Sequence, residues 1–391
     1  MERVTTKLEE LTAAVGSAVV CERDGRVVAS PKSTEEAAAI LRFADANGIG
    51  VEIAGAGTKR GWPGAVSGEL VLETRGLAGV REHSWQDLTA TVGPGTTWAE
   101  MQRVLAQHGQ QVALDPLWPE QATVGGVVAT NDSGALRHKY GSLRDLVIGM
   151  TLVLADGTIA RSGGKVVKNV AGYDLHKLMI GAYGTLAVVT EVTFRLHSIP
   201  RNTRVWSFEA AEAGACGEVL MKVLDSQLSV QAMQLRASSA GFTLDVELAC
   251  VDEVMRAQLG ALDALAGRAG VVDGDVFAAR DRLFASEGVV VKATMLASAI
   301  AKISAEVVRG GGEAVTQASG IMLARFADSG ADAAVARLRE MVAPDGSVSV
   351  LRGTDGLGSL APVASAGVLM REIKRRFDPK GTLNPGVVIG A

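Results

Sequence analysis

A predicted strand that runs directly into a glycine-rich turn is the feature that most limits how this sequence can fold. Ile49–Ala54 is a short apolar run, and the turn Gly55-Ala56-Gly57-Thr58-Lys59-Arg60-Gly61 follows it without a break. Backbone N–H groups in such a turn bind phosphate, although an ordinary tight turn of an α/β domain is the alternative. A dinucleotide-binding Rossmann unit needs a helix immediately after the turn. Here Trp62-Pro63-Gly64 leads to a second strand, Leu70–Thr74, so a nicotinamide cofactor is disfavoured.

A second glycine-containing stretch runs from Leu114 to Asp145 and reads as neither ordinary core nor ordinary surface. Thr123-Val124-Gly125-Gly126 predicts a helix start with free backbone donors, and Asn131-Asp132-Ser133-Gly134 predicts a polar loop. Backbone without a Cβ lets a bound group approach closely. We therefore expect a large planar or phosphorylated cofactor along this stretch, with the turn at Ala54–Gly64 closing over it.

Composition narrows the class of protein. The 391 residues are 48% hydrophobic, which is enough for two packed domains. A net charge of -4 with scattered basic residues disfavours nucleic acid as a partner. The apolar run Leu146–Ala155 is too short to span a bilayer, and the start MERVTTKLEE does not resemble a signal sequence. A soluble, cytoplasmic protein is expected.

The cysteines and histidines offer no pattern typical of a metal or iron–sulfur site. Cys21, Cys216 and Cys250 form no CxxC pair. The histidines show no HxxxH spacing; they are His83, His108, His138, His176 and His197. No metal is expected, so redox chemistry in this chain requires an organic cofactor.

Hydrophobic periodicity predicts two different halves. Before Ile199, glycine turns separate strands, and the clearest elements are helices at Thr34–Ala46 and Trp98–Gln107 and strands at Leu88–Val92, Val147–Leu154 and Ala187–Leu196. Later strands are predicted at Val205–Phe208, Val230–Leu235, Phe242–Leu248, Val289–Thr294, Ile321–Phe326 and Ser347–Leu351. Helices alternate with them at Glu212–Leu224, Asp252–Ala266, Ser298–Val308 and Ala331–Met341, and a last helix follows at Val363–Arg376. The second half therefore predicts one antiparallel sheet covered by helices.

Five segments, in this order, resemble the vanillyl-alcohol oxidase or PCMH-type FAD-linked oxidases. They are AGAGTKRGWPG (54–64), DP with ATVGGVVATNDSG (115–134), KYGSLRDLVIGMTLVLADG (139–157), YDLHKLMIGAYGTLAVVTEVTFRL (173–196) and FDPKGTLNPG (377–386). Within that family, the run GKVVKNVAGYDLHKL and the compact C-terminal half are similar to the smaller FAD-binding subunits of bacterial glycolate oxidases. Each turn alone is a weak signal, whereas the ordered combination is specific.

The resemblance implies an α+β fold. A PCMH-type FAD-binding domain of two α/β subdomains is expected over residues 1–200. An antiparallel-sheet cap domain covered by helices is expected over residues 201–365, and a C-terminal segment, 366–391, is expected to return to the FAD domain.

The resemblance also implies which residues bind FAD. The backbone groups of Gly55, Ala56, Gly57 and Thr58 are expected to hold its pyrophosphate. Val188 and Val189 are expected to meet its adenine side through backbone contacts. The isoalloxazine ring and ribityl chain are expected against Thr123, Gly125, Gly126, Asn131, Ser133 and Gly134, with Asn384 near the flavin ring. The other expected site residues are Asp115, Pro116 and Tyr140. Relatives with covalent flavin carry a His or Cys in the loop that corresponds to Gly55–Gly64, and this loop has neither. Non-covalent FAD is therefore expected.

The implied function is that of a glycolate oxidase or dehydrogenase subunit, which oxidises glycolate or a similar 2-hydroxy acid to the 2-oxo acid. The implied partners are a larger flavin subunit and an iron–sulfur subunit, which would also place the protein at the periphery of the inner membrane. Lys292, Arg325 and Arg352 are candidates for binding the substrate carboxylate, with solvent-facing strand positions as the alternative.

Two further functions stay open because no histidine follows His197, whereas larger catalytic relatives carry a histidine-rich site in their second half. One is a flavin-carrying structural or electron-relay subunit without turnover of its own. The other is a stand-alone FAD-dependent D-2-hydroxy-acid dehydrogenase. The sequence does not nominate a general base.

Overall fold

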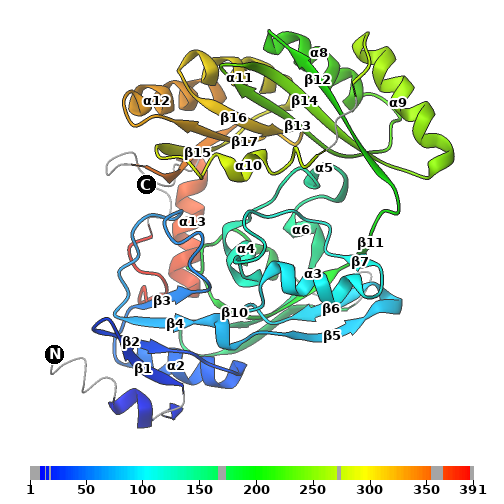
Figure 1. Ribbon diagram of the computed structural model, residues 1–391. Coiled ribbons are helices and arrows are strands. Elements are labelled where there is room, and N and C mark those ends of the chain that lie inside the picture. Colours follow the sequence, from blue (N-terminus) through cyan, green and yellow to red (C-terminus); the bar gives the residue numbers. More distant parts are fainter. Residues whose placement is uncertain are drawn as a thin grey trace. The chain divides into compact units, whose positions relative to one another are not determined.

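The chain forms two units in a computed structural model (Figure 1). The structure describes residues 9–13, 15–16, 19–165, 173–270, 274–353 and 364–387. Within these residues, the first unit draws on 1–133, 142–199 and 364–391, and the second on 134–141 and 200–363. The first unit is therefore assembled from segments that are far apart in the sequence.

A small mixed sheet in the first unit supports the glycine turn. Its strands are β1 (Val20–Arg23), β2 (Arg26–Ala29), β4 (Leu70–Glu73) and β3 (Val51–Ala54), in that order. β2, β4 and β3 are parallel. Helix α2 (Thr34–Ala46) begins where Ser33 accepts a hydrogen bond from the N–H of Glu36, and its apolar face is buried. The glycine turn begins at the carboxyl end of β3, a common position for ligand-binding turns.

A larger antiparallel sheet completes the first unit. Its strands, in spatial order, are β5 (Val80–Ser84), β6 (Thr89–Val92), β10 (Val188–Arg195), β8 (Val147–Val153) and β9 (Ile159–Gly163). The helices of this region are α3 (Trp98–Ala106), α4 (Val124–Thr130), α6 (Leu143–Leu146) and α7 (His176–Met179). A short ladder pairs β7 (Gln110–Gln111) with β11 (His197–Ser198). Buried side chains such as Trp98, Val127 and Phe194 join α3 and α4 to the sheet in one core.

The C-terminal segment is held against the small sheet. Helix α13 (Ala364–Phe377) is followed by Asp378, whose carboxylate accepts the N–H groups of Thr382 and Leu383 at 2.8 Å each. Leu383 then bridges to Val51 of β3. Asn384 is thereby carried to the base of the glycine turn.

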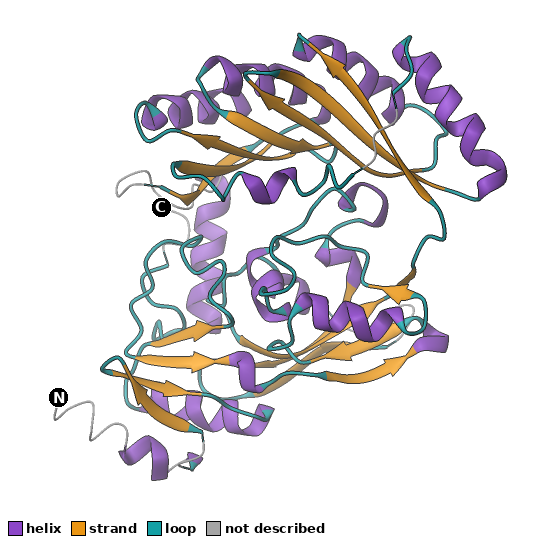
Figure 2. Ribbon diagram, viewed as in Figure 1, coloured by secondary structure: helices purple, strands orange, loops and turns teal. Residues whose placement is uncertain are grey.

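One antiparallel sheet forms the second unit. Its order is β12 (Thr203–Ala210), β14 (Gly241–Ala249), β13 (Val230–Ser238), β16 (Glu313–Gln317), β17 (Ile321–Phe326), β15 (Val289–Thr294) and β18 (Ser347–Arg352). Helices α8 (Ala213–Leu224), α9 (Asp252–Ala266), α11 (Ile300–Arg309) and α12 (Ala331–Val342) lie along one of its faces (Figure 2). The short helices α5 (Arg137–Tyr140) and α10 (Ala279–Arg282) also belong to this unit.

The α+β class and the helix-covered antiparallel sheet predicted from the sequence are confirmed. Helices α2 and α9 and strand β17 have the predicted bounds. Strand β16 was missed because Glu313–Gln317 is short and follows three glycines, and because its pairing with β13 and β17 forms only in the tertiary structure. Strand β5 was missed as well, since only Val80 in it is apolar.

Candidate cofactor site

A cavity of about 380 Å³ opens at the carboxyl end of β3 in the first unit. Its wall includes the turn Gly55–Arg60, the start of α4 with Thr123 and Gly126, and both Tyr183 and Asn384. The structure therefore brings the two glycine-containing segments of the sequence to one cavity. A separate slot of about 80 Å³ shares Gly55, Gly126 and Asn384 with it.

The glycine turn presents donors to this cavity. Among the described residues, no acceptor takes the N–H groups of Ala56, Gly57 or Thr58. Gly57 has φ +77°, and no atom lies within 4 Å of the position that a Cβ would occupy. Consecutive free N–H groups beside open space form an anion-binding nest, so these residues fit a pyrophosphate.

The donors at the start of α4 are already used. Thr123 caps the helix by accepting the N–H of Gly126 at 3.3 Å, and the N–H of Gly125 donates to Pro94 at 2.8 Å. Gly55 has to be glycine because a Cβ there would lie 2.4 Å from the Thr123 hydroxyl. The start of α4 therefore packs closely against the turn and shapes the cavity wall.

A buried lysine joins the two segments. The Lys59 ammonium lies 3.4 Å from the Asp132 carboxylate, and the two side chains are only 3% and 5% exposed. The ammonium donates to the Leu117 carbonyl at 3.2 Å, while Asp132 accepts the Leu117 N–H at 2.8 Å. The rings of Trp62 and Trp118 lie 5.7 and 5.4 Å from the ammonium. Sequence reading missed this cluster because lysines are rarely buried.

Asn384 and Tyr183 link three chain segments at the cavity. The Asn384 amide accepts the Ile53 N–H at 2.7 Å and donates to the Tyr183 carbonyl at 2.6 Å. A Cβ on Gly184 would lie 2.8 Å from the same amide, which explains the glycine there. Burial raises the pKa of the Tyr183 phenol to about 12, and the negative charge of Asp132 adds to this effect.

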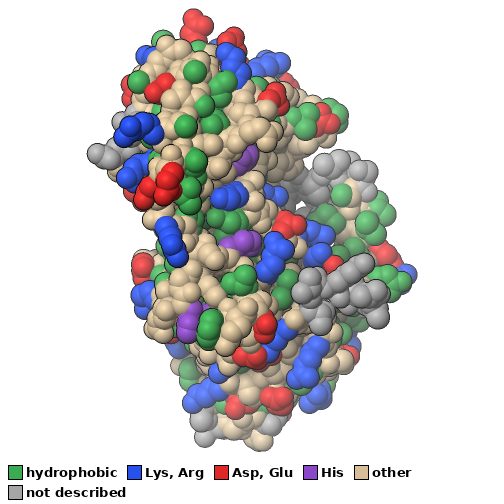
Figure 3. Space-filling model, turned by 90° about the vertical axis from the view of Figure 1, so that its right-hand side faces the viewer, with side chains coloured by type: hydrophobic (Ala, Val, Ile, Leu, Met, Phe, Trp, Pro, Cys, Tyr) green, Lys and Arg blue, Asp and Glu red, His purple; other side chains and the backbone are tan. Residues whose placement is uncertain are grey.

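The cavity wall has more basic than acidic side chains. Its five cations are Arg23, Arg26, Lys59, Arg60 and Arg75, and its three carboxylates are Asp24, Glu52 and Glu73. Glu52 pairs with Arg26 at 2.7 Å and also with Arg60, and Glu73 pairs with Arg23 at 2.6 Å. The remaining positive charge favours an anionic ligand such as a diphosphate. On the face drawn in Figure 3, acidic and basic side chains are interspersed.

The fold is that of two solved enzyme structures. The chain aligns with p-cresol methylhydroxylase at a TM-score of 0.75 and 15% identity, covering 99% of this chain and 96% of that one. Alkyldihydroxyacetonephosphate synthase gives a TM-score of 0.75 and 16% identity, covering 98% and 84%. At these identities the likeness concerns the fold alone.

Two family matches decide the assignment. Residues 25–163 match the family described as FAD binding domain, and residues 365–388 match FAD linked oxidases, C-terminal domain. This chain carries the FAD binding domain of the FAD-linked oxidases and part of their C-terminal domain. The cofactor of this FAD-linked oxidase is FAD, as the sequence predicted, and the free donors of the nest fit its pyrophosphate.

Curated relatives of this FAD-linked oxidase act on 2-hydroxy acids according to their names. A D-lactate dehydrogenase of Archaeoglobus fulgidus is 40% identical over 46% of this chain and 40% of its own length. Glycolate oxidase subunit GlcD of Bacillus subtilis is 37% identical over 48% of this chain and 41% of its own length. A D-2-hydroxyglutarate dehydrogenase of Stutzerimonas stutzeri is 34% identical over 44% and 37%. The chain thus spans about two fifths of the length of these relatives.

The residues predicted to bind FAD fall into three groups. Nine line one or both cavities: Gly55, Ala56, Gly57, Thr58, Thr123, Gly125, Gly126, Val189 and Asn384. Five others of the first unit do not line them: Asp115, Pro116, Asn131, Ser133 and Val188. The Val188 side chain is fully buried in the core that also contains Val51 of β3. Gly134 and Tyr140 belong to the second unit, where the Tyr140 hydroxyl donates to Gln231 at 3.2 Å.

The three predicted substrate cations lie in the second unit, and two of them are engaged by neighbouring groups. Arg325 pairs with Glu313 at 2.6 Å and donates to the Glu287 carbonyl at 2.9 Å. Arg352 donates to the carbonyls of Phe284 and Gly288. Lys292 lies in β15, where its side chain is partly buried and also interacts with a neighbouring group. A nearby guanidinium that the sequence did not single out, Arg236, binds Asp245 through two nitrogens at 2.7 and 2.9 Å.

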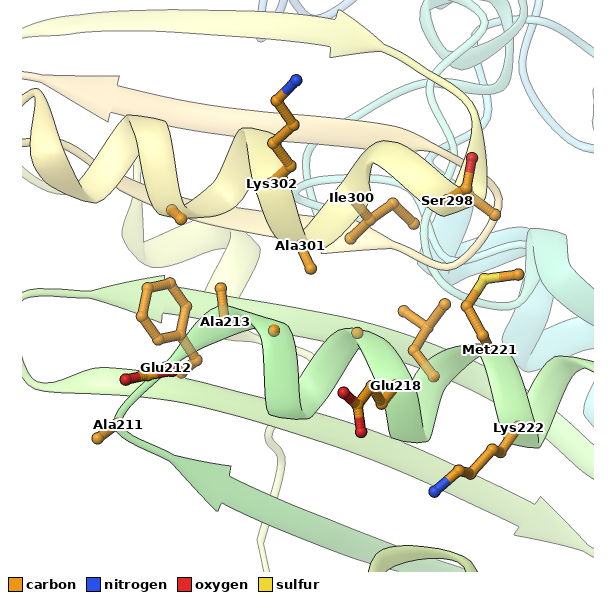
Figure 4. A pocket seen from close by; sticks show the side chains of 16 residues that line it. Ala211, Glu212, Ala213, Glu218, Met221, Lys222, Ser298, Ile300, Ala301 and Lys302 are labelled. Atoms are coloured by element: carbon orange, nitrogen blue, oxygen red, sulfur yellow. The ribbon is translucent and has the colours of Figure 1, made fainter.

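A further hollow of about 880 Å³ lies between α8 and α11 (Figure 4). Small and apolar side chains such as Ala213, Ala301 and Met221 line it, and a Cβ on Gly217 would lie 2.6 Å from the Cβ of Ala301. Its described lining offers neither a nest nor a buried charge, so the cavity at the glycine turn fits an anionic cofactor better. In the described residues, no helix is long and apolar enough to cross a membrane.

Proposed function

We propose that this FAD-linked oxidase binds FAD non-covalently in the cavity at the carboxyl end of β3. The nest of Ala56, Gly57 and Thr58 would hold the pyrophosphate through N–H donors that no described residue uses. Residues 1–200 and 366–391 would form the FAD domain, and residues 201–365 the cap. The remaining predicted positions, which do not line the cavity, would serve the flavin end of the cofactor or shape its surroundings.

We propose further that the chain is the FAD-binding subunit of a glycolate oxidase or dehydrogenase complex, which oxidises glycolate or a similar 2-hydroxy acid to the 2-oxo acid. The observation that carries this proposal is the nest-bearing cavity in a chain whose relatives include a glycolate oxidase subunit and D-lactate and D-2-hydroxyglutarate dehydrogenases. The chemistry that FAD supplies in such a site is acceptance of a hydride from the substrate carbon that bears the hydroxyl.

The residues of this chain contribute binding and orientation to that chemistry. The nest and the net positive wall hold the diphosphate, and the Lys59–Asp132 pair fixes the turn against the segment after Leu114. Electrons then have to leave the cofactor, and no CxxC motif supplies iron–sulfur ligands in this sequence. By the resemblance to glycolate oxidase subunits, the proposed partners are an iron–sulfur subunit and a larger flavin subunit.

The visible spectrum of the purified chain tests cofactor and substrate together. We expect a yellow protein after reconstitution with FAD, and we expect glycolate or D-lactate to bleach its flavin band when the partner subunits are present. The reconstituted complex should lose activity when this chain is left out. Colourless protein at saturating FAD would refute the cofactor site, and full activity of the complex without this chain would refute the assigned role.

A second function, an electron-relay or structural subunit without turnover, is favoured by the cations of the second unit. Arg236, Arg325 and Arg352 are each engaged by carboxylates or carbonyls of their own unit, so a substrate carboxylate would have to compete for them. Under this alternative, neither glycolate nor D-lactate bleaches the flavin band of the isolated chain, whereas adding reduced partner subunits does. Bleaching of the isolated chain, with steady turnover to an artificial acceptor, would instead support a stand-alone D-2-hydroxy-acid dehydrogenase.

A further inference from the structure

Tyr183 has a backbone conformation that is unusual for a large side chain. Its φ is +51°, in the left-handed region, which is costly for residues that carry a Cβ. The neighbouring positions with positive φ, Gly181 and Gly184, are glycines. Two hydrogen bonds hold the Tyr183 peptide in place: its N–H donates to Ala129 at 2.8 Å, and its carbonyl accepts from Asn384 at 2.6 Å. A tyrosine at a strained backbone position suggests that its side chain has a functional role.

The surroundings of Tyr183 are those of the proposed FAD site. Tyr183 lines both the wide cavity and the narrow slot, whereas Asn131 and Ser133 line neither. It thus shares the wide cavity with the nest of Ala56–Thr58. The slot is bordered by apolar residues such as Val189 and Ala187. Tyr183 is therefore shared by the cavity that contains the nest and the apolar slot.

The Tyr183 hydroxyl is a neutral hydrogen-bond donor that has no acceptor among the described residues. It makes no hydrogen bond to any of them, although Tyr140 in the second unit has its hydroxyl bonded to Gln231. Burial raises the pKa of the Tyr183 phenol to about 12, so the proton stays on the oxygen at neutral pH. A phenol with its proton in place donates to a phosphate or ribose oxygen without bringing charge into the site.

We propose that the Tyr183 hydroxyl is a direct hydrogen-bond donor to the adenosine diphosphate half of FAD. This inference rests on the FAD site proposed above. Tyr183 would complete a diphosphate site whose other donors are the backbone N–H groups of the nest. The left-handed backbone would then serve to aim the ring into the cavity, with Asn384 holding the Tyr183 carbonyl from behind.

Binding of FAD and of ADP to the apoprotein tests the assignment. Tyr183→Phe removes only the hydroxyl, and we expect both dissociation constants, measured by calorimetry, to rise about 10- to 100-fold, because a hydrogen bond to a charged group is lost. Tyr173→Phe is the matched control, because Tyr173 is 88% exposed and should leave both affinities unchanged. The melting temperature of the apoprotein should be the same in both variants and in wild type.

Three results would overturn the assignment. Unchanged FAD affinity in Tyr183→Phe would show that the hydroxyl does not contact the cofactor. Weaker FAD binding with unchanged ADP binding would place the contact on the flavin half. A lower melting temperature of the Tyr183→Phe apoprotein would show that the hydroxyl has a protein partner. Failure of wild type to bind FAD would instead refute the proposed site itself, so the two failures are distinguishable.

Discussion

Lys59→Met is expected to destabilise the apoprotein by about 3–5 kcal/mol, the range for removing one partner of a buried ion pair. The substitution keeps most of the side-chain volume but leaves the Asp132 carboxylate, 5% exposed, with no cation at 3.4 Å. Lys59 binds the Leu117 carbonyl and Asp132 binds the Leu117 N–H, so the segment after Leu114 should also loosen against the glycine turn. Urea denaturation gives the free energy of unfolding, and calorimetry should show weaker FAD binding in the same variant.

Two further variants separate the buried charge from other effects of removing a lysine. In Lys59→Met with Asp132→Asn, the amide oxygen still accepts the Leu117 N–H and no charge is left buried, so most of the lost stability should return. Lys165→Met breaks an exposed ion pair with Glu82, and stability should be unchanged. A single Lys59→Met variant as stable as wild type would show that the pair does not hold the two segments together.

Asn384→Ala is expected to lower the free energy of unfolding of the apoprotein by about 2–4 kcal/mol, since two buried groups lose their partners at about 1–3 kcal/mol each. These groups are the Ile53 N–H and the Tyr183 carbonyl, bonded at 2.7 and 2.6 Å. Alanine also tolerates the left-handed φ of +43° less well than asparagine. FAD affinity should fall together with stability, because the Tyr183 peptide is no longer held.

The control for this prediction is Asn47→Ala, which removes an exposed side-chain hydrogen bond to Phe43 and should cost much less. The comparison also tests the residue's role. Sequence reasoning placed Asn384 near the flavin ring, and the structure shows its amide bonded to the cavity wall. An Asn384→Ala apoprotein with wild-type stability and impaired FAD binding would contradict the positioning role and favour direct contact with the cofactor.

Local patterns predicted the elements that build the site. The apolar run before Gly55 became β3, and the glycine turn after it retained the free donors expected of a phosphate nest. Thr123 followed by two glycines predicted a helix start, and Thr123 caps α4. These predictions succeed because strand formation, turn geometry and helix capping depend on residues that are close in sequence.

The contacts that shape the cavity were not predictable in this way. The Asn384 hydrogen bonds reach across 331 residues to Ile53 and across 201 residues to Tyr183. Lys59 stands in the predicted glycine turn, yet its side chain is buried beside the rings of Trp62 and Trp118. Lysine in a turn is usually exposed to solvent. Only the packing of distant segments supplies the carboxylate and the carbonyl that offset the cost of burying its charge.

By itself, the sequence determined that a glycine turn follows a strand in the first half and that the second half is built from one helix-covered sheet, because hydrophobic periodicity and glycine turns act locally. Only the tertiary structure decided which side chains surround the nest and which cations of the second unit are engaged. Those outcomes depend on partners brought together by the fold. A charge is stable in a buried position only where such a partner lies within a few ångströms.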